Sequence, residues 1–147
     1  MKGLADILLA SQHKKAVVAD CVQLIETHVA SRSGLKGMAL KTGLSMLKRA
    51  KPGILERATG YLLPEFITAL DPLYQECQRS RQPDFDAFLQ AHSHRATRAL
   101  LEVADRRVEE SDSNTVKSTY ARMRGGAEAE VLAVMPGLSN LLSRYLP

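Results

Sequence analysis

Apolar residues recur at helical spacing along almost the whole chain, whereas the alternating pattern typical of strands is nearly absent. The clearest example is the segment that begins after Ser11, a residue able to cap a helix, and runs to about Ala30. At about 100° per residue its apolar positions share one arc. These positions are Val17, Val18, Cys21, Val22, Leu24, Ile25, His28 and Val29. The pattern predicts an amphipathic helix here and an all-α fold for the chain.

Capping residues, prolines and glycines divide the rest of the periodic pattern into further helices. Ser33 can cap a helix that ends at Lys51, because Pro52-Gly53 interrupts it. Elsewhere, proline suits the first turn of a helix, and a glycine pair breaks one. We therefore expect helices over about 3–10, 54–62, from 64 onward with a restart or kink at 71–72, and over 114–124, 127–135 and 136–145.

The longest predicted helix covers residues 84–110. One apolar stripe runs along its whole length, and a second apolar face adds Leu101, Ala104 and Val108 in the C-terminal half. The first stripe is formed by Phe85, Phe88, Leu89, His92, Ala96, Ala99, Leu100 and Val103. A helix that is apolar on two sides has neighbours on both flanks. With no repeat or linker to divide the chain, we predict one domain over residues 1–147, a bundle of about seven helices around a central helix 84–110.

Composition supports a helical, cytoplasmic protein. Aromatic residues make up 5% of the 147 residues, so the core must be aliphatic, and straight-chain aliphatic residues favour helices. Cys21 and Cys77 show no paired spacing, and we expect them to be reduced and buried. The early apolar run Ile7–Ala10 is too short for a signal peptide, and no segment approaches the roughly 20 apolar residues of a transmembrane helix.

The positive charge of the chain is concentrated in one quarter of it. Residues 31–60 hold seven lysines and arginines against Glu56 alone, and no acid occurs between Glu26 and Glu56. On a helical wheel of the segment 33–51, a narrow polar arc carries Lys41, Ser45, Lys48 and Arg49. The remaining wide arc, which we expect to be buried, consists of Leu35, Ala39, Leu40, Gly43, Leu44, Met46, Leu47 and Ala50. Each glycine inside a helix costs about 1 kcal/mol, so Gly34, Gly37 and Gly43 indicate close packing of another backbone.

Two interpretations of this basic stripe remain open. Carboxylates of the acidic segment 61–90 can lie across the stripe and neutralise it; those available are Glu65, Asp71, Glu76, Asp84 and Asp86. Alternatively the stripe binds the phosphates of nucleic acid, an acidic protein or an anionic lipid surface. In that case the binding residues are Lys41, Ser45, Lys48, Arg49 and Lys51. Sites for nucleic acid and for lipid surfaces usually contain aromatic residues, and none lies among these cations.

The sequence indicates no catalytic, metal or cofactor site. His92 and His94 would lie about 200° apart on a helix, so one ion could not bind both rings. Cys21 has no neighbour that favours its thiolate. No nucleophile elbow, phosphate-binding loop or dinucleotide turn is present. We therefore expect a protein that is not an enzyme and that carries no cofactor.

Short groups of residues spread over nearly the whole chain resemble a family of small bacterial all-helical proteins of unknown function. They are Val17-Val18-Ala19-Asp20, Ser33-Gly34-Leu35-Lys36-Gly37, Lys41, Gly43, Lys51-Pro52-Gly53, Leu62-Leu63-Pro64-Glu65-Phe66, Leu70-Asp71-Pro72-Leu73-Tyr74, Asp84-Phe85, Ala99-Leu100-Leu101, Tyr120, Arg124 and Pro136. The resemblance implies a compact helical fold and a cytosolic bacterial protein. It implies no catalytic residue, cofactor or partner.

Three functions follow from these patterns. The first is a non-enzymatic helical interaction module that forms a homo-oligomer, because wide apolar arcs on several helices exceed what one small bundle can bury. The second is a binder of polyanions (nucleic acid or an anionic surface) through the basic helix 33–51. The third is a carrier of a small apolar ligand, with a pocket between the helices 84–110 and 33–51.

Overall fold

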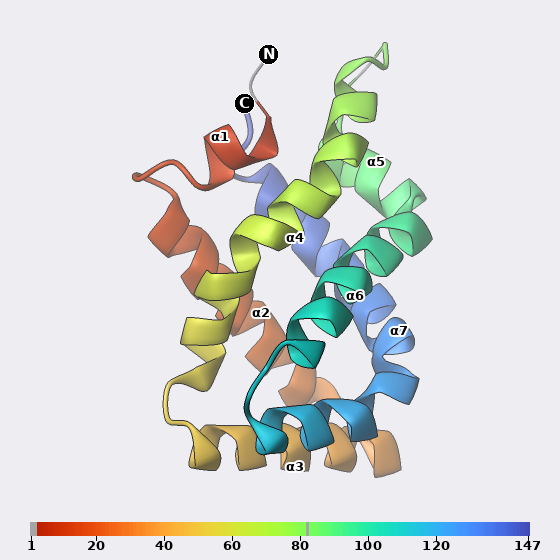
Figure 1. The fold of residues 1–147 in the computed structure, drawn as a ribbon. Coiled ribbons are helices and arrows are strands. Elements are labelled where there is room, and N and C mark those ends of the chain that lie inside the picture. Colours follow the sequence, from red (N-terminus) through yellow and green to blue (C-terminus); the bar gives the residue numbers. More distant parts are fainter. Residues whose placement is uncertain (1–2, 82) are drawn as a thin grey trace.

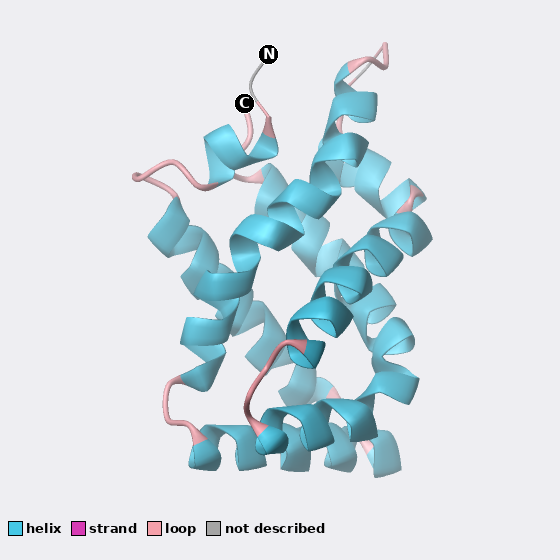
Figure 2. Cartoon of the chain, in the orientation of Figure 1, coloured by secondary structure: helices cyan, strands magenta, loops and turns pink. Residues whose placement is uncertain are grey.

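The computed structural model describes residues 3–81 and 83–147, and within them the chain forms seven α-helices and no strand (Figures 1 and 2). This confirms the predicted all-α multi-helix bundle. The helices are α1 (Leu4–Leu8), α2 (Lys14–Ser31), α3 (Gly34–Ala50), α4 (Ile54–Gln78), α5 (Phe85–Ala91), α6 (Ser93–Glu109) and α7 (Asn114–Ser143). α2, α4, α6 and the C-terminal part of α7 run along the bundle (Figure 1). α3 and the first part of α7 lie across one end of it, opposite α1 (Figure 1).

The predicted central helix 84–110 is wrong, because the segment forms two helices that meet at His92. His92 has φ −113° and ψ 32°, which is outside the helical region, and its ring lies 4.3 Å from that of Phe88. The residues at the junction, His92 to His94, are weak helix formers. Phe85 and Leu89 of α5 and Ala96 of α6 are all buried in the core, on either side of this break.

The helix boundaries predicted at the prolines are also wrong, because the helices continue where the sequence predicts breaks. α4 continues through Pro64 and Pro72, and α7 continues through Pro136 and the glycine pair 125–126. A proline removes one backbone hydrogen bond, but burial on both sides of it outweighs that loss. In α4, Leu63, Ile67 and Leu70 are all buried. α7, with 30 residues, is therefore the longest helix, and with α4 it takes the central position that the sequence assigned to 84–110.

One hydrophobic core cluster joins α1, α2, α4, α5, α6 and α7. Its fully buried members include Leu4, Ile67, Leu89 and Met135, which come from four different helices. No residue of α3 belongs to this cluster, and the buried residues of α3 are two glycines, Gly37 and Gly43. The bundle therefore closes its core without side chains from α3.

The expected burial of the wide apolar arc of α3 is wrong for part of that arc. Leu35 is 88% exposed and Met46 is 39% exposed, and Ala39 and Ala50 are exposed as well. Leu40, Leu44 and Leu47 are half-buried. The reason is geometric: a helix that lies across the end of a bundle contacts its neighbours through one side only.

Truncation of a core residue and of a residue on α3 should therefore have very different effects on stability. We expect Leu70→Ala to lower the free energy of unfolding by about 2–5 kcal/mol, because Leu70 is 2% exposed and its removal leaves a cavity. Leu35→Ala should change the free energy by less than about 0.5 kcal/mol. Urea denaturation followed by circular dichroism measures both values. Equal losses for the two variants would contradict the described core.

Candidate functional site

α3 crosses the end of the bundle because the chain turns sharply at each of its ends. Before the helix, Arg32 and Ser33 are extended and Gly34 has φ +75°. After it, Lys51 is extended and Gly53 has φ +75°. A positive φ is the conformation that only glycine adopts without strain, so both corners depend on a glycine.

Close packing of α3 depends on its other two glycines, as the sequence indicates. A Cβ atom on Gly43 would lie 2.7 Å from Sδ of Met123 and 3.4 Å from Cγ2 of Thr119, both on α7. A Cβ atom on Gly37 would lie 2.6 Å from the backbone carbon of Arg32. Side chains at these positions would hold the helix away from its neighbours. At Gly43 the backbone of α3 thus lies directly against side chains of α7, and only Gly37 meets another backbone, as the sequence predicts.

One side of α3, which borders the space between α3 and α7, carries a stripe of exposed residues that we name the α3 crest. It consists of Leu35, Met38, Thr42 and Met46, which follow one another at helical spacing. Leu35 is 88% and Met38 is 65% exposed. Only one other large apolar side chain of the described residues, Tyr61 on α4, is comparably exposed. Exposed apolar residues gathered on one face are typical of interaction sites.

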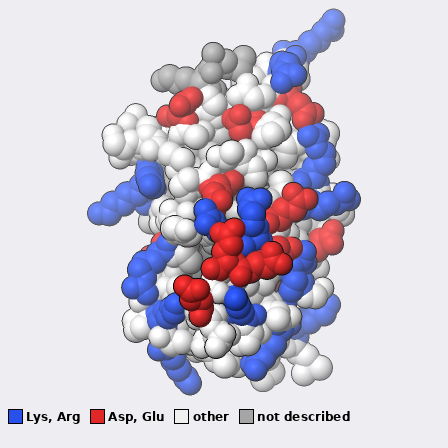
Figure 3. Space-filling model, viewed as in Figure 1, with Lys and Arg blue, Asp and Glu red and all other residues white. Residues whose placement is uncertain are grey.

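The predicted anion-binding residues lie beside the α3 crest and are all exposed; they are Lys41, Ser45, Lys48, Arg49 and Lys51. Nζ of Lys48 lies 2.6 Å from Oε1 of Glu26 on α2, and both side chains are 45% exposed. For residues 3–81 and 83–147 the structure gives no ion pair to Lys41, Arg49 or Lys51. In Figure 3 acidic side chains gather in the middle of the view, and Lys and Arg side chains surround them and reach the lower end.

The carboxylates of segment 61–90 are engaged elsewhere and do not cover the basic stripe. Glu65 pairs with Arg107. Glu76 binds Arg95 at 2.5 Å. The three aspartates serve local structure: Asp71 accepts from the backbone of Leu4 at 2.9 Å, Asp84 caps α5 through Ala87 at 3.2 Å, and Asp86 accepts from Ser139 at 2.5 Å. The cations of α3 therefore face solvent, apart from the exposed pair with Glu26.

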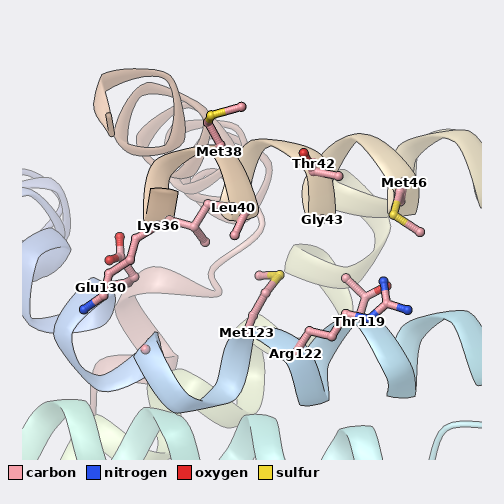
Figure 4. Close-up of a pocket in the computed structure, with 12 residues that line it drawn as sticks. Lys36, Met38, Leu40, Thr42, Gly43, Met46, Thr119, Arg122, Met123 and Glu130 are labelled. Atoms are coloured by element: carbon pink, nitrogen blue, oxygen red, sulfur yellow. The ribbon is translucent and has the colours of Figure 1, made fainter. Parts of the chain in front are cut away.

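A cavity of about 430 Å³ lies between α3 and α7, and we name it the α3–α7 groove. Figure 4 shows Met123 pointing from α7 toward α3, with Met46 on the opposite wall. Glu130 also lines the groove, and its two carboxylate oxygens each lie 2.8 Å from a partner: Nε2 of His28 and Nη2 of Arg32. Lys36 and Arg122 line it too, and the described residues offer them no ion pair. The groove is apolar inside and cationic at its edges.

Residues that the sequence singled out for chemistry are not brought together. His92 is half-buried at the junction of α5 and α6, while His94 is exposed. In the part of the chain that the structure describes, no three potential metal ligands form a group. Cys21 is a free thiol on α2, and burial, with the nearby charge of Asp20, raises its pKa to about 11. The expected pocket beside 84–110 is not the observed groove, which is lined by α3 and α7.

Sequence reasoning missed the α3 crest and the carboxylate of Glu130. The wheel of 33–51 placed Leu35 and Met46 on the arc to be buried, and the sequence does not indicate how much of an apolar arc the neighbouring helices cover. Glu130 lies 98 residues from Arg32 in the chain, so only the fold brings them together.

The stability of the bundle should fall at acidic pH, because carboxylates that form ion pairs become protonated there. Hydrogen bonds from Arg124 and Tyr120 lower the pKa of Asp105, which ties α6 to α7. A carboxylate with a lowered folded-state pKa stabilises the protein fully above its unfolded value, and this stabilisation is lost as the pH falls through the folded value. We expect the urea midpoint to fall below about pH 4, and Asp105→Asn to lower the midpoint at neutral pH and flatten the acid dependence.

The matched control for this prediction is Asp112→Asn, since Asp112 is an exposed carboxylate for which the described residues supply no hydrogen bond. It should follow the wild-type profile. An acid dependence that Asp105→Asn leaves unchanged would show that the link from Asp105 to Arg124 adds nothing to stability.

Comparison with known proteins identifies the family of the chain, and that family has no known function. No helix among the described residues is both long enough and apolar enough to cross a membrane. No curated protein and no solved structure gives a significant match. A family model matches residues 4–146, nearly the whole chain, and confirms the resemblance to a family of unknown function. The chain belongs to the family of unknown function DUF6918.

Proposed function

We propose that this protein is a non-enzymatic interaction module that binds an acidic, amphipathic helix of a partner protein along α3. The observation that carries the proposal is the exposure of Leu35 and Met38, at 88% and 65%, on a helix whose Lys41 and Arg49 have no ion pair among the described residues. Burial of such a side chain against a partner contributes roughly 1.5–3 kcal/mol. The surrounding lysines and arginines attract carboxylates and raise the rate of association.

Charge favours an acidic partner over a second copy of the chain on this surface. α3 carries Lys36, Lys41, Lys48 and Arg49 and no acid, and Lys51 follows it directly. Two α3 helices packed crest to crest would bring these like charges together, and like charges across an interface oppose association. Self-association of the protein through another face is compatible with the proposal, because it leaves α3 free.

The apolar crest also favours a protein over the other anionic partners. Phosphates of nucleic acid offer nothing that would cover Leu35 and Met38, and α3 has no aromatic residue on which bases could stack. An anionic lipid surface would cover the crest, but interfacial helices usually carry Trp or Phe, which α3 lacks. A small apolar ligand needs a pocket that encloses most of its surface, and the α3–α7 groove is only half enclosed.

The proposal predicts binding of a designed acidic helix. The probe is a synthetic peptide of about 18 residues, the length of α3, with leucines on one face and glutamates on the others. We expect wild-type protein to bind it with an affinity that falls as salt rises. Charge reversal by Lys41→Glu with Arg49→Glu should weaken binding about tenfold or more, which corresponds to about 1.4 kcal/mol. Isothermal titration calorimetry measures both affinities.

Two controls separate this surface from general charge. Lys15→Glu with Lys14→Glu reverses two exposed lysines at the start of α2, far from α3, and should leave the affinity nearly unchanged. Leu35→Ala should weaken binding although it leaves stability unchanged. Equal weakening by both charge reversals, or binding of anionic vesicles or duplex DNA without binding of the peptide, would overturn the proposal.

A further inference from the structure

We infer that the α3–α7 groove receives one apolar side chain of the partner helix, which is held against Met123 and Met46 above a floor of small residues. This inference rests on the proposed function and assigns the position at which the partner is anchored. The anchor lies between α3 and α7. The cations that support the proposed function are spread along the whole of α3.

The floor of the groove is built from residues that leave room. The small residues that line it are Ala39 and Gly43 of α3 and Thr119 and Gly126 of α7. A Cβ atom on Gly126 would have no other heavy atom within 4 Å, so space above this residue is free. A cavity of roughly 150 Å³ already holds a benzene molecule. At about 430 Å³, the groove has room for a leucine or phenylalanine side chain.

The walls of the groove can adapt to the side chain that enters. Two of the chain's five methionines, Met46 and Met123, point into it, whereas the side chain of Met38 points away from α7 (Figure 4). Methionine is unbranched and polarisable, and surfaces rich in it accept apolar side chains of different shapes. Met123 points across the groove toward α3 (Figure 4), so its rotation changes the width available to a ligand. We therefore expect an apolar anchor without a strict requirement for one residue type.

The charges at the edges of the groove suit a partner helix that carries acidic residues on either side of its anchoring side chain. Lys36 and Arg122 line the groove, and no ion pair to either occurs among residues 3–81 and 83–147. The carboxylate of Glu130, which could repel an acidic ligand, is held by His28 and Arg32 at 2.8 Å each. An amphipathic helix laid in a groove presents its apolar residues inward and its charged residues to the edges.

Two adjacent glycines of α7 provide a matched pair of variants. Gly126→Leu places a leucine side chain in the groove, whereas Gly125 is exposed and does not line it. Neither glycine has a positive φ, and a Cβ atom on either meets no heavy atom within 4 Å. Both variants should therefore fold, which circular dichroism and urea denaturation verify. With the acidic peptide as probe, we expect Gly126→Leu to weaken binding at least tenfold and Gly125→Leu to change it less than twofold.

A second measurement links the groove to one side chain of the peptide. Replacement of single peptide leucines by alanine should identify one position whose loss weakens binding to the wild type but not to Gly126→Leu, since the anchor is already excluded there. Unchanged affinity of Gly126→Leu, or equal loss with Gly125→Leu, overturns the groove inference. If Lys41→Glu with Arg49→Glu still weakens binding in that case, the proposed function stands. Failure of the wild type to bind the peptide overturns both.

Discussion

The close approach of α3 to α7 at Gly43 determines how the surface of this protein is arranged. Because a Cβ atom there would lie 2.7 Å from Sδ of Met123, the backbone of α3 packs directly against the side chains of Met123 and Thr119 on α7. The contact is narrow, and it cannot cover an apolar arc as wide as that of α3. Part of the arc consequently remains in solvent, beside the α3–α7 groove.

The same constraint explains why an apolar surface coexists with a complete core. The core cluster takes its residues from six helices and none from α3. Leu35 and Met38 are therefore not needed to stabilise the fold, yet they remain apolar among lysines. Selection for solubility alone would favour polar residues at such positions. The binding role that we propose would account for both properties together.

The sequence predicts a helix best when the residues at its ends, such as caps, prolines and glycines, determine where it begins and ends. Ser33 and Pro52-Gly53 bound the third helix, and the structure places it at Gly34–Ala50, within one residue of the expected 33–51. Prediction fails where tertiary packing overrides a local signal. Pro64 and Pro72 remain inside α4 because the buried residues around them hold one continuous helix, and His92 interrupts an unbroken apolar pattern because α5 and α6 pack in different directions.

The candidate site shows the same division between local and tertiary information. The helical wheel identified the cations of α3 that prove exposed, because a run of lysines without acids is visible in one dimension. The pairing of Lys48 with Glu26 and the distribution of the acids of segment 61–90 depend on which helices become neighbours. The side of α3 that faces solvent depends on the corners at Gly34 and Gly53, whose conformation no periodicity encodes.

The crosswise position of α3 has a practical consequence for the handling of the molecule. The C-terminus lies near α1, at the end of the bundle opposite α3 (Figure 1). A fluorophore or an affinity tag joined to the C-terminus therefore projects away from α3. Protein immobilised on a sensor through that tag keeps its cationic helix turned toward the flowing solution.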